Sequence, residues 1–244
     1  MRTLGWIAIG GLGIGVASLS LAYALGGRDL HRLPFDFASR ASCGEVAKGS
    51  PSVRRLAWDN GDAIELSVPG TVYFRGGQGS EVVVRGSPDL VANVEVRGGR
   101  LTLDCHGWTA GRDLEITLPG RAFRDIRLSG SSKLVMENVS QPDLALRISG
   151  SGTVRAQGSV DQATVKVSGS GEARLGDLAM KQLTVDISGS GKVEAAPKDT
   201  ADVKISGSGD VKLLSRPANL TSKVAGSGRI SQVSPDSEGG KDKR

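Results

Sequence analysis

Short runs in which apolar and polar residues alternate recur through the second half of this 244-residue chain. Examples are Ile126-Arg127-Leu128, Val165-Lys166-Val167 and Val185-Asp186-Ile187, and the alternation resumes a few residues after each run. Because successive side chains of a strand point to opposite faces, this alternation is typical of strands with one buried face. The many Val and Ile residues favour the same interpretation. We therefore predict an all-β structure for this part of the chain.

A tetrapeptide rich in glycine and serine follows each run and divides the chain into repeats. The tetrapeptides begin at residues 129, 149, 168, 188, 206 and 225, which are 20, 19, 20, 18 and 19 positions apart. A near-constant period indicates one structural unit stacked on copies of itself. A unit of about 19 residues is too short for a strand–helix–strand element, which needs roughly 30.

The period favours a single elongated parallel β-solenoid in which each repeat is one coil with a Ser-Gly-Ser-Gly corner. Glycine at the corner permits a positive φ angle. A hairpin meander is the alternative, but it would not need an equivalent corner in every repeat. Counting the weaker β pattern of residues 56–125, we expect roughly nine to ten coils. One N-terminal hydrophobic helix completes the predicted fold.

Aromatic residues are absent from the repeats and present ahead of them. No Phe, Trp or Tyr occurs between residues 126 and 233, as expected for a core of narrow columns. The residues ahead of the repeats include Trp58, Tyr73, Phe74, Trp108 and Phe123. Larger side chains at one end suit a cap that closes the stack against water and edge pairing.

The first residues predict an exported protein. Residues 4–27 carry no charge, and the stretch is long enough to span a bilayer. Ala22-Tyr23-Ala24 also offers a signal-peptide cleavage site. We interpret residues 1–27 as an uncleaved membrane anchor or a cleaved signal peptide. Both place the remainder in the periplasm or cell envelope, and the first also makes the inner membrane a partner. The other predicted segments are a linker (28–55), the solenoid (56–233) and a disordered polar tail (234–244).

The chain contains two cysteines, Cys43 and Cys105. In an exported protein an even number of cysteines favours a disulfide. Cys105 continues the inward alternation of Leu101 and Leu103, and Cys43 precedes the β region. We predict a Cys43–Cys105 disulfide that ties the entering segment to the first coils. Closing a loop of about 60 residues contributes ~4 kcal/mol in the entropic model. Two reduced thiols are the alternative.

Cofactors, metals and nucleic acids have no recognisable site in the sequence. The two histidines, His31 and His106, both lie outside the repeats, so no corner serine has a histidine base within them. The corners lack the regularly placed aspartate of calcium-binding repeats. The net charge of +5 is spread along the chain without a basic run, which does not fit a nucleic-acid arm.

The acids of the repeats occupy different positions in the coil. Asp186 falls in one predicted column, Glu172 and Asp210 in a second, and Glu194 in a third. Glycoside hydrolysis needs a pair of carboxylates flanking the scissile bond, and no such pair recurs. An envelope polysaccharide-active enzyme is therefore the alternative function, and a non-enzymatic module is the prediction.

A column of cations is the clearest surface signal in the repeats. The central outward position of the first strand in each coil is cationic in five of six repeats: Arg127, Arg147, Lys166, Lys204 and Lys223, with Asp186 in the remaining one. Stacked about 5 Å apart, like charges repel unless neighbours or ligands neutralise them. The column predicts a face for an anionic polymer. Ordinary solubility, with nearby acids compensating, is the alternative.

The recurring Ser-Gly-Ser-Gly corners and the upstream segment ITLPGRAFRDIRLSGSS (116–132) resemble the "putative auto-transporter adhesin, head GIN domain" family. The resemblance covers about residues 56–233. It implies a β-solenoid-like fold and a bacterial cell-envelope setting, and it brings no catalytic motif. We therefore expect an exported, non-enzymatic adhesin-like or scaffold module that binds an anionic envelope polymer through its basic face. The sequence leaves the oligomeric state open.

Overall fold

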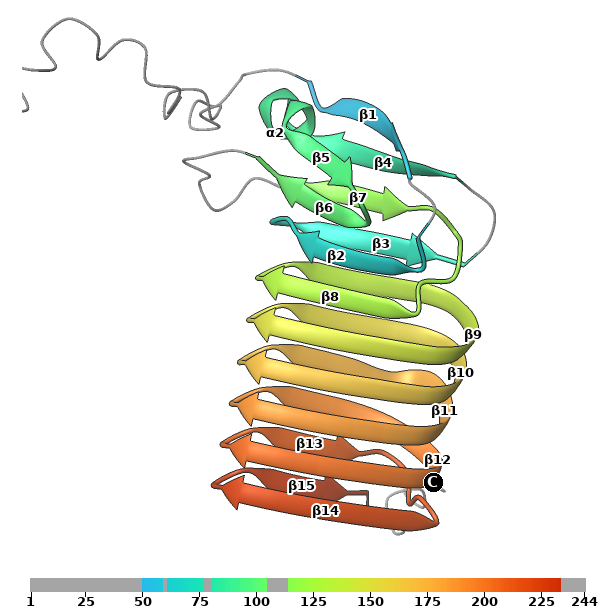
Figure 1. Cartoon of the computed structure of the whole chain (residues 1–244), viewed down its shortest axis with the longest axis vertical. Coiled ribbons are helices and arrows are strands. Elements are labelled where there is room, and N and C mark those ends of the chain that lie inside the picture. The colour runs from blue at the N-terminus through green and yellow to red at the C-terminus, as the bar shows by residue number, and fades with distance from the viewer. Residues whose placement is uncertain (1–49, 59–60, 77–79, 105–113, 234–244) are drawn as a thin grey trace, which may run out of the picture. The chain divides into compact units, whose positions relative to one another are not determined.

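The structure, a computed structural model, describes residues 50–58, 61–76, 80–104 and 114–233 (Figure 1). The part ahead of the repeats contains β1 (Ser52–Ala57), β2 (Ala63–Ser67), β3 (Thr71–Arg75), β4 (Glu81–Gly86), α2 (Pro88–Ala92), β5 (Val94–Arg97), β6 (Arg100–Leu103) and β7 (Glu115–Leu118). The repeats contain β8 (Asp125–Gly130), β9 (Lys133–Gly150), β10 (Thr153–Gly169), β11 (Glu172–Gly189), β12 (Lys192–Gly207), β13 (Asp210–Leu213), β14 (Asn219–Gly226) and β15 (Arg229–Gln232).

The repeats form a parallel β-solenoid of about five turns. Each turn pairs in parallel with the next, as β9 does with β10 and β10 with β11. The alternation and the corner prediction are confirmed, but the expected nine to ten coils are too many. The reason is that the part ahead of the repeats also contains antiparallel pairs, in which β4 joins β1 and β7 and β5 joins β6.

Two faces result from the wrapping of the chain, and Figure 1 shows them as the near and far bands of the stack. Face A comprises β2, β8, β14 and residues 143–150, 162–169, 182–189 and 200–207 of the long strands. Face B comprises β3, β13, β15 and residues 133–137, 153–156, 172–175 and 192–195.

The Gly-Ser corners connect face A to face B and lie directly above one another. The first corner glycine has a positive φ in every turn, for example +104° at Gly150 and +120° at Gly189. The serine that follows donates its backbone N–H to a glycine carbonyl of the preceding turn, at 2.9 Å from Ser151 to Gly130 and from Ser190 to Gly169. The stacked corners therefore extend the hydrogen-bond ladder.

The second turn is a bend within a strand in β9 to β12, whereas between β13 and β14 the strand is interrupted. The sequence predicts separate turns there, at Gly158-Ser159 for example, whereas β9 to β12 continue through these positions with local shifts of register. Pairing with the parallel neighbours resumes on either side of each bend, and the register shifts where the chain turns.

The core lies between the two faces. Each turn contributes alternating buried residues to it, such as Val165 and Val167 from face A and Val154 and Ala156 from face B. Because these columns contact the columns above and below, stability is close to a sum over neighbouring turns.

An aromatic cluster and a short helix lie in the part of the stack ahead of the repeats. Phe123 makes edge-to-face contacts with Trp58 and Phe74, with ring centroids 5.4 and 5.8 Å apart. Helix α2 packs against β1 and β4, with Leu90 and Val91 buried. Because Phe74 lies on β3, which pairs with β7 and β9, this aromatic cluster is inside the stack, and it is the helix that lies at the N-terminal end.

Several sequence predictions fall outside the described residues: the helix in 1–27, the Cys43–Cys105 disulfide and the tail 234–244. None of the residues that the structure describes forms a helix with the length and hydrophobicity needed to cross a bilayer. Strand β1 begins at Ser52, inside the segment predicted as a linker.

Candidate anion-binding face

The predicted cations stack into one column on face A. The register pairs Arg127 with Arg147, Arg147 with Lys166, Lys166 with Asp186, Asp186 with Lys204 and Lys204 with Lys223. We call these six residues the basic column. From Arg127 to Lys204 each of them lies between two buried residues of its strand, so its side chain points to solvent. Neighbouring strands are about 4.8 Å apart, which makes the column a ladder of closely spaced charges.

Two residues outside the repeats extend the column. Strand β2 lies beside β8 and β6 lies beside β2, so that Glu65 pairs with Arg127 and Arg100 pairs with Glu65. The repeat period could not find them, because these strands do not follow chain order. A signal was nevertheless present, since Ile64-Glu65-Leu66 has the same apolar–charged–apolar pattern as the repeats.

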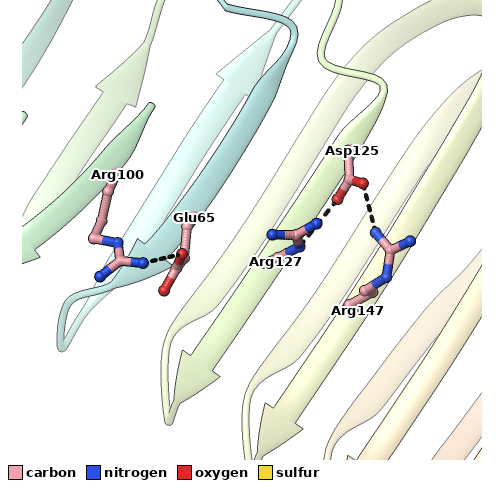
Figure 2. A network of polar contacts seen from close by, with 5 residues as sticks. All are labelled: Glu65, Arg100, Asp125, Arg127 and Arg147. Atoms are coloured by element: carbon pink, nitrogen blue, oxygen red, sulfur yellow. Dashed lines mark hydrogen bonds and ion pairs between the residues drawn. The ribbon is translucent and has the colours of Figure 1, made fainter. Parts of the chain in front are cut away.

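Carboxylates neutralise the N-terminal half of the column (Figure 2). Arg100 Nη2 lies 2.8 Å from Glu65 Oε2. Asp125 bridges two arginines, with 3.5 Å between its Oδ1 and Arg127 Nε and 2.5 Å between its Oδ2 and Arg147 Nη1. Sequence reasoning missed Asp125, which precedes Arg127 by two residues and therefore points to the same side of β8.

The lysines in the C-terminal half of the column form no ion pairs within the described residues. Lys166, Lys204 and Lys223 are exposed, and none forms an ion pair with any residue in the described ranges. Asp186 lies between Lys166 and Lys204 and is half-buried, and Asp202 precedes Lys204 by two residues on the same face, so two carboxylates lie near the three lysines without forming ion pairs with them. The three lysines thus form the part of the predicted site that is available to an external anion.

A column of serines runs beside the lysines. It consists of Ser149, Ser168, Ser188 and Ser206, which pair in register and are exposed. Each serine follows a residue of the basic column by two positions and therefore shares its face. Hydroxyl groups can donate hydrogen bonds to anionic oxygens, so face A offers donors as well as charge.

Face B has a mixed charge pattern. One of its columns reads Thr153, Glu172, Lys192, Asp210 and Arg229, so that acids and bases alternate. Next to it, Lys212 Nζ lies 3.4 Å from Glu194 Oε1, and Arg174 Nε lies 2.9 Å from Glu172 Oε1. The hydrogen bonds that Arg174 donates to the carboxylate of Glu172 raise the pKa of Arg174 above its ordinary value. Lys133, Arg155 and Lys192 of face B are also exposed and form no ion pair within the described ranges, so what distinguishes face A is the alignment of its cations in one column.

The four acids considered in the sequence, Glu172, Asp186, Glu194 and Asp210, lie in the three predicted columns. Glu172 and Asp210 share a column but are separated by Lys192, and the other two acids stand beside bases of their own columns. Within the described residues, no three His, Cys, Asp or Glu side chains gather as a metal site. Both histidines and both cysteines lie outside those residues.

The stacked turns with a glycine–serine corner in each repeat define a β-solenoid repeat protein. The chain belongs to the family described as "putative auto-transporter adhesin, head GIN domain", whose model matches residues 61–217. The resemblance seen in the sequence is thereby confirmed. A comparison with curated proteins finds no match.

Comparison with solved structures finds similar chains at low sequence identity. A crystal structure described as a putative adhesin from Bacteroides fragilis is 17% identical, with a TM-score of 0.60, and the match covers 75% of this chain and 97% of that one. A protein described as a putative lipid binding protein from Parabacteroides distasonis is 18% identical, with a TM-score of 0.47 and coverage of 77% and 98%. A putative adhesin from Parabacteroides merdae is 16% identical, with a TM-score of 0.46 and coverage of 77% and 98%.

Proposed function

We propose that this protein is an exported, non-enzymatic module of the cell envelope that binds an anionic polymer through face A. The observation that carries the proposal is the row of exposed lysines, Lys166, Lys204 and Lys223, which have no ion-pair partner among the described residues. Family membership supports the envelope setting and the adhesin-like role.

The geometry of face A suits an extended ligand. A polymer with regularly spaced anionic groups can run along the solenoid axis and contact successive turns, because the lysines recur at multiples of about 4.8 Å. The neighbouring serine hydroxyls add hydrogen-bond donors. Flat strands without a deep cleft fit a ligand that is held by many weak contacts along its length.

The charge balance of the acids supports a non-enzymatic role. Acid–base hydrolysis of a polysaccharide needs one carboxylic acid and one carboxylate across the same bond. In the repeats Glu172 binds Arg174 and Glu194 binds Lys212, while Asp186 is flanked by two lysines. Each of these carboxylates therefore has a cation, and not a second carboxylate, as its neighbour.

Binding to immobilised long-chain polyphosphate and to a polyuronate tests the proposal, with neutral dextran as the matrix control. We expect the full chain to be retained on both polyanions and released by salt. Changing Lys166, Lys204 and Lys223 together to Gln removes the unpaired charge of face A. This variant should lose affinity by at least tenfold.

A matched variant on face B controls for net charge. Replacing Lys133, Lys192 and Lys212 by Gln removes the same number of charges from the opposite face, and it should bind like the unmodified chain. Equal losses in the two variants would mean that net charge, and not face A, attracts the polymer. Release of shortened polymer during the assay would contradict the non-enzymatic role.

A further inference from the structure

The two ends of the solenoid differ. At the N-terminal end, α2 covers the first strands and buries Leu90 and Val91. Arg54 on β1 contacts the end of this helix, since its Nη1 donates a hydrogen bond to the carbonyl of Ala92 at 2.8 Å. At the other end, β14 and β15 form the last turn, and within the described residues β14 pairs with β12 alone and β15 with β13 alone (Figure 1).

Two apolar side chains of the last turn are exposed at positions that are buried in the preceding turn. Leu220 and Val224 are 40% and 43% exposed. Their partners one turn earlier, Ala201 and Ile205, are fully buried. All eight residues of β14 are exposed, and its outer edge presents backbone donors and acceptors without partners among the described residues. An unpaired edge with exposed apolar side chains is a template for another strand.

The chain's own C-terminal segment is a poor cover for this end. Residues 234–244 have the sequence SPDSEGGKDKR, which contains no Leu, Ile, Val, Met or aromatic residue. It can offer little apolar surface to Leu220 and Val224. Its proline and two adjacent glycines also do not favour a strand.

Strand β14 is complementary to a second copy of itself. In an antiparallel pair centred on Ser222, Leu220 of one copy faces Val224 of the other, so that the two apolar residues cover each other. On the outer side the same register places Lys223 opposite Thr221, which avoids direct contact between two lysines. A two-fold arrangement of this kind uses one patch on both subunits.

We propose that two copies of this chain pair through β14 at their C-terminal ends and form an antiparallel seam that continues face A from one copy into the other. The lysines of the two copies then lie on one uninterrupted sheet. This pairing does not depend on polymer binding, but if face A binds a polymer, the dimer doubles the length of the binding surface and adds avidity.

Disulfide trapping tests the register of the seam. Ser222 lies on the two-fold axis, so Ser222→Cys places two thiols on directly opposite residues, within the range that a disulfide bridges. We expect the full chain, purified in mild detergent because of residues 4–27, to form a covalent dimer whose bond maps to the peptide containing residue 222. Ser206→Cys, one turn inside on the outer surface, is the matched control and should not be trapped.

Light scattering of the full chain tests the apolar contact. Leu220→Lys combined with Val224→Lys should convert the dimer to a monomer, while the circular dichroism spectrum stays unchanged because both side chains are already exposed. The proposal is wrong if the unmodified chain is monomeric at tens of micromolar, or if the double variant keeps the dimer mass. It is equally wrong if Ser222→Cys is trapped no more than Ser206→Cys.

A monomer in which hydrogen exchange shows β14 protected would assign the cover to the chain's own terminal residues and would overturn the proposal. Polyanion binding by such a monomer would leave the proposed function of face A intact, so the two proposals fail separately.

Discussion

The two glycines of each corner have different roles. The first has a positive φ, such as +112° at Gly169, which side-chain-bearing residues adopt at a cost. The second is constrained by packing, because a Cβ on Gly171 would lie 2.4 Å from Cγ2 of Ile148. At the first corner Ser132 takes this place, and its Oγ donates to the carbonyl of Val68 at 2.5 Å.

The first corner glycine offers a matched pair of substitutions. Gly130 has φ +80° with nothing within 4 Å of a built Cβ, whereas a Cβ on Gly150, at φ +104°, would lie 2.7 Å from the carbonyl oxygen of Gly130. We expect Gly130→Ala to cost about 1–2 kcal/mol through backbone strain. Gly150→Ala should cost a further ~1–3 kcal/mol through the clash. Urea unfolding followed by circular dichroism measures both, and equal costs would contradict the stacked-corner geometry.

At the level of single residues, the sequence predicted the positions that recur once in each repeat. Arg147, Lys166 and Lys204 could be placed in one column because each occupies the same position of its coil. Glu65 and Asp125, which neutralise part of that column, could not be foreseen in this role. Glu65 reaches the column through a strand that is out of chain order. The position of Asp125 is not acidic in the next three turns, where Ala145, Thr164 and Thr184 occupy it.

Among the elements, the repeats were predictable and the N-terminal end was not. The alternation gave the strands and the corners of β8 to β15, since local pattern and global stack agree there. The antiparallel strands β1 and β4 depend on pairing partners far apart in sequence, whereas β5 pairs with the next strand, β6, across Gly98-Gly99. Helix α2 was missed although Ser87-Pro88-Asp89 is a helix-start signal, with Pro at the first helical position.

Because α2 packs against β1 and β4 at the N-terminal end of the stack, a mutation in α2 should destabilise the strands next to it. Leu90 is fully buried, so Leu90→Ala should cost about 2–5 kcal/mol. In a stack of turns each unit depends mainly on its neighbours. Hydrogen exchange should therefore accelerate in β1 and β4 and stay unchanged in β11 and β12.

Val53→Ala is the control for this prediction. Val53 is on β1 but 58% exposed, and its replacement should change stability by less than about 0.5 kcal/mol. Uniform acceleration of exchange over all strands after Leu90→Ala would show that the solenoid unfolds as one unit, contrary to this account.

For the solenoid as a whole, the alignment of cations along face A is the feature that the fold adds to the sequence. A net charge of +5 is modest, but stacking places Lys166, Lys204 and Lys223 in one column of face A, whereas Lys192 on face B stands between Glu172 and Asp210. Potential of one sign along a surface raises the local concentration of oppositely charged ligands. The stacked repeats therefore give face A a row of positive charges, although the overall composition is ordinary.

The salt dependence of polyphosphate binding tests this claim most directly. Neutralising a polyanion releases its counterions, and each ionic contact adds about 0.7–0.9 to the slope of log affinity against log salt concentration for nucleic acids. Replacing Lys166, Lys204 and Lys223 by Gln should lower the slope by about 2, while replacing Lys133, Lys192 and Lys212 should leave it unchanged. Equal slopes for the two variants would contradict the assignment of binding to face A.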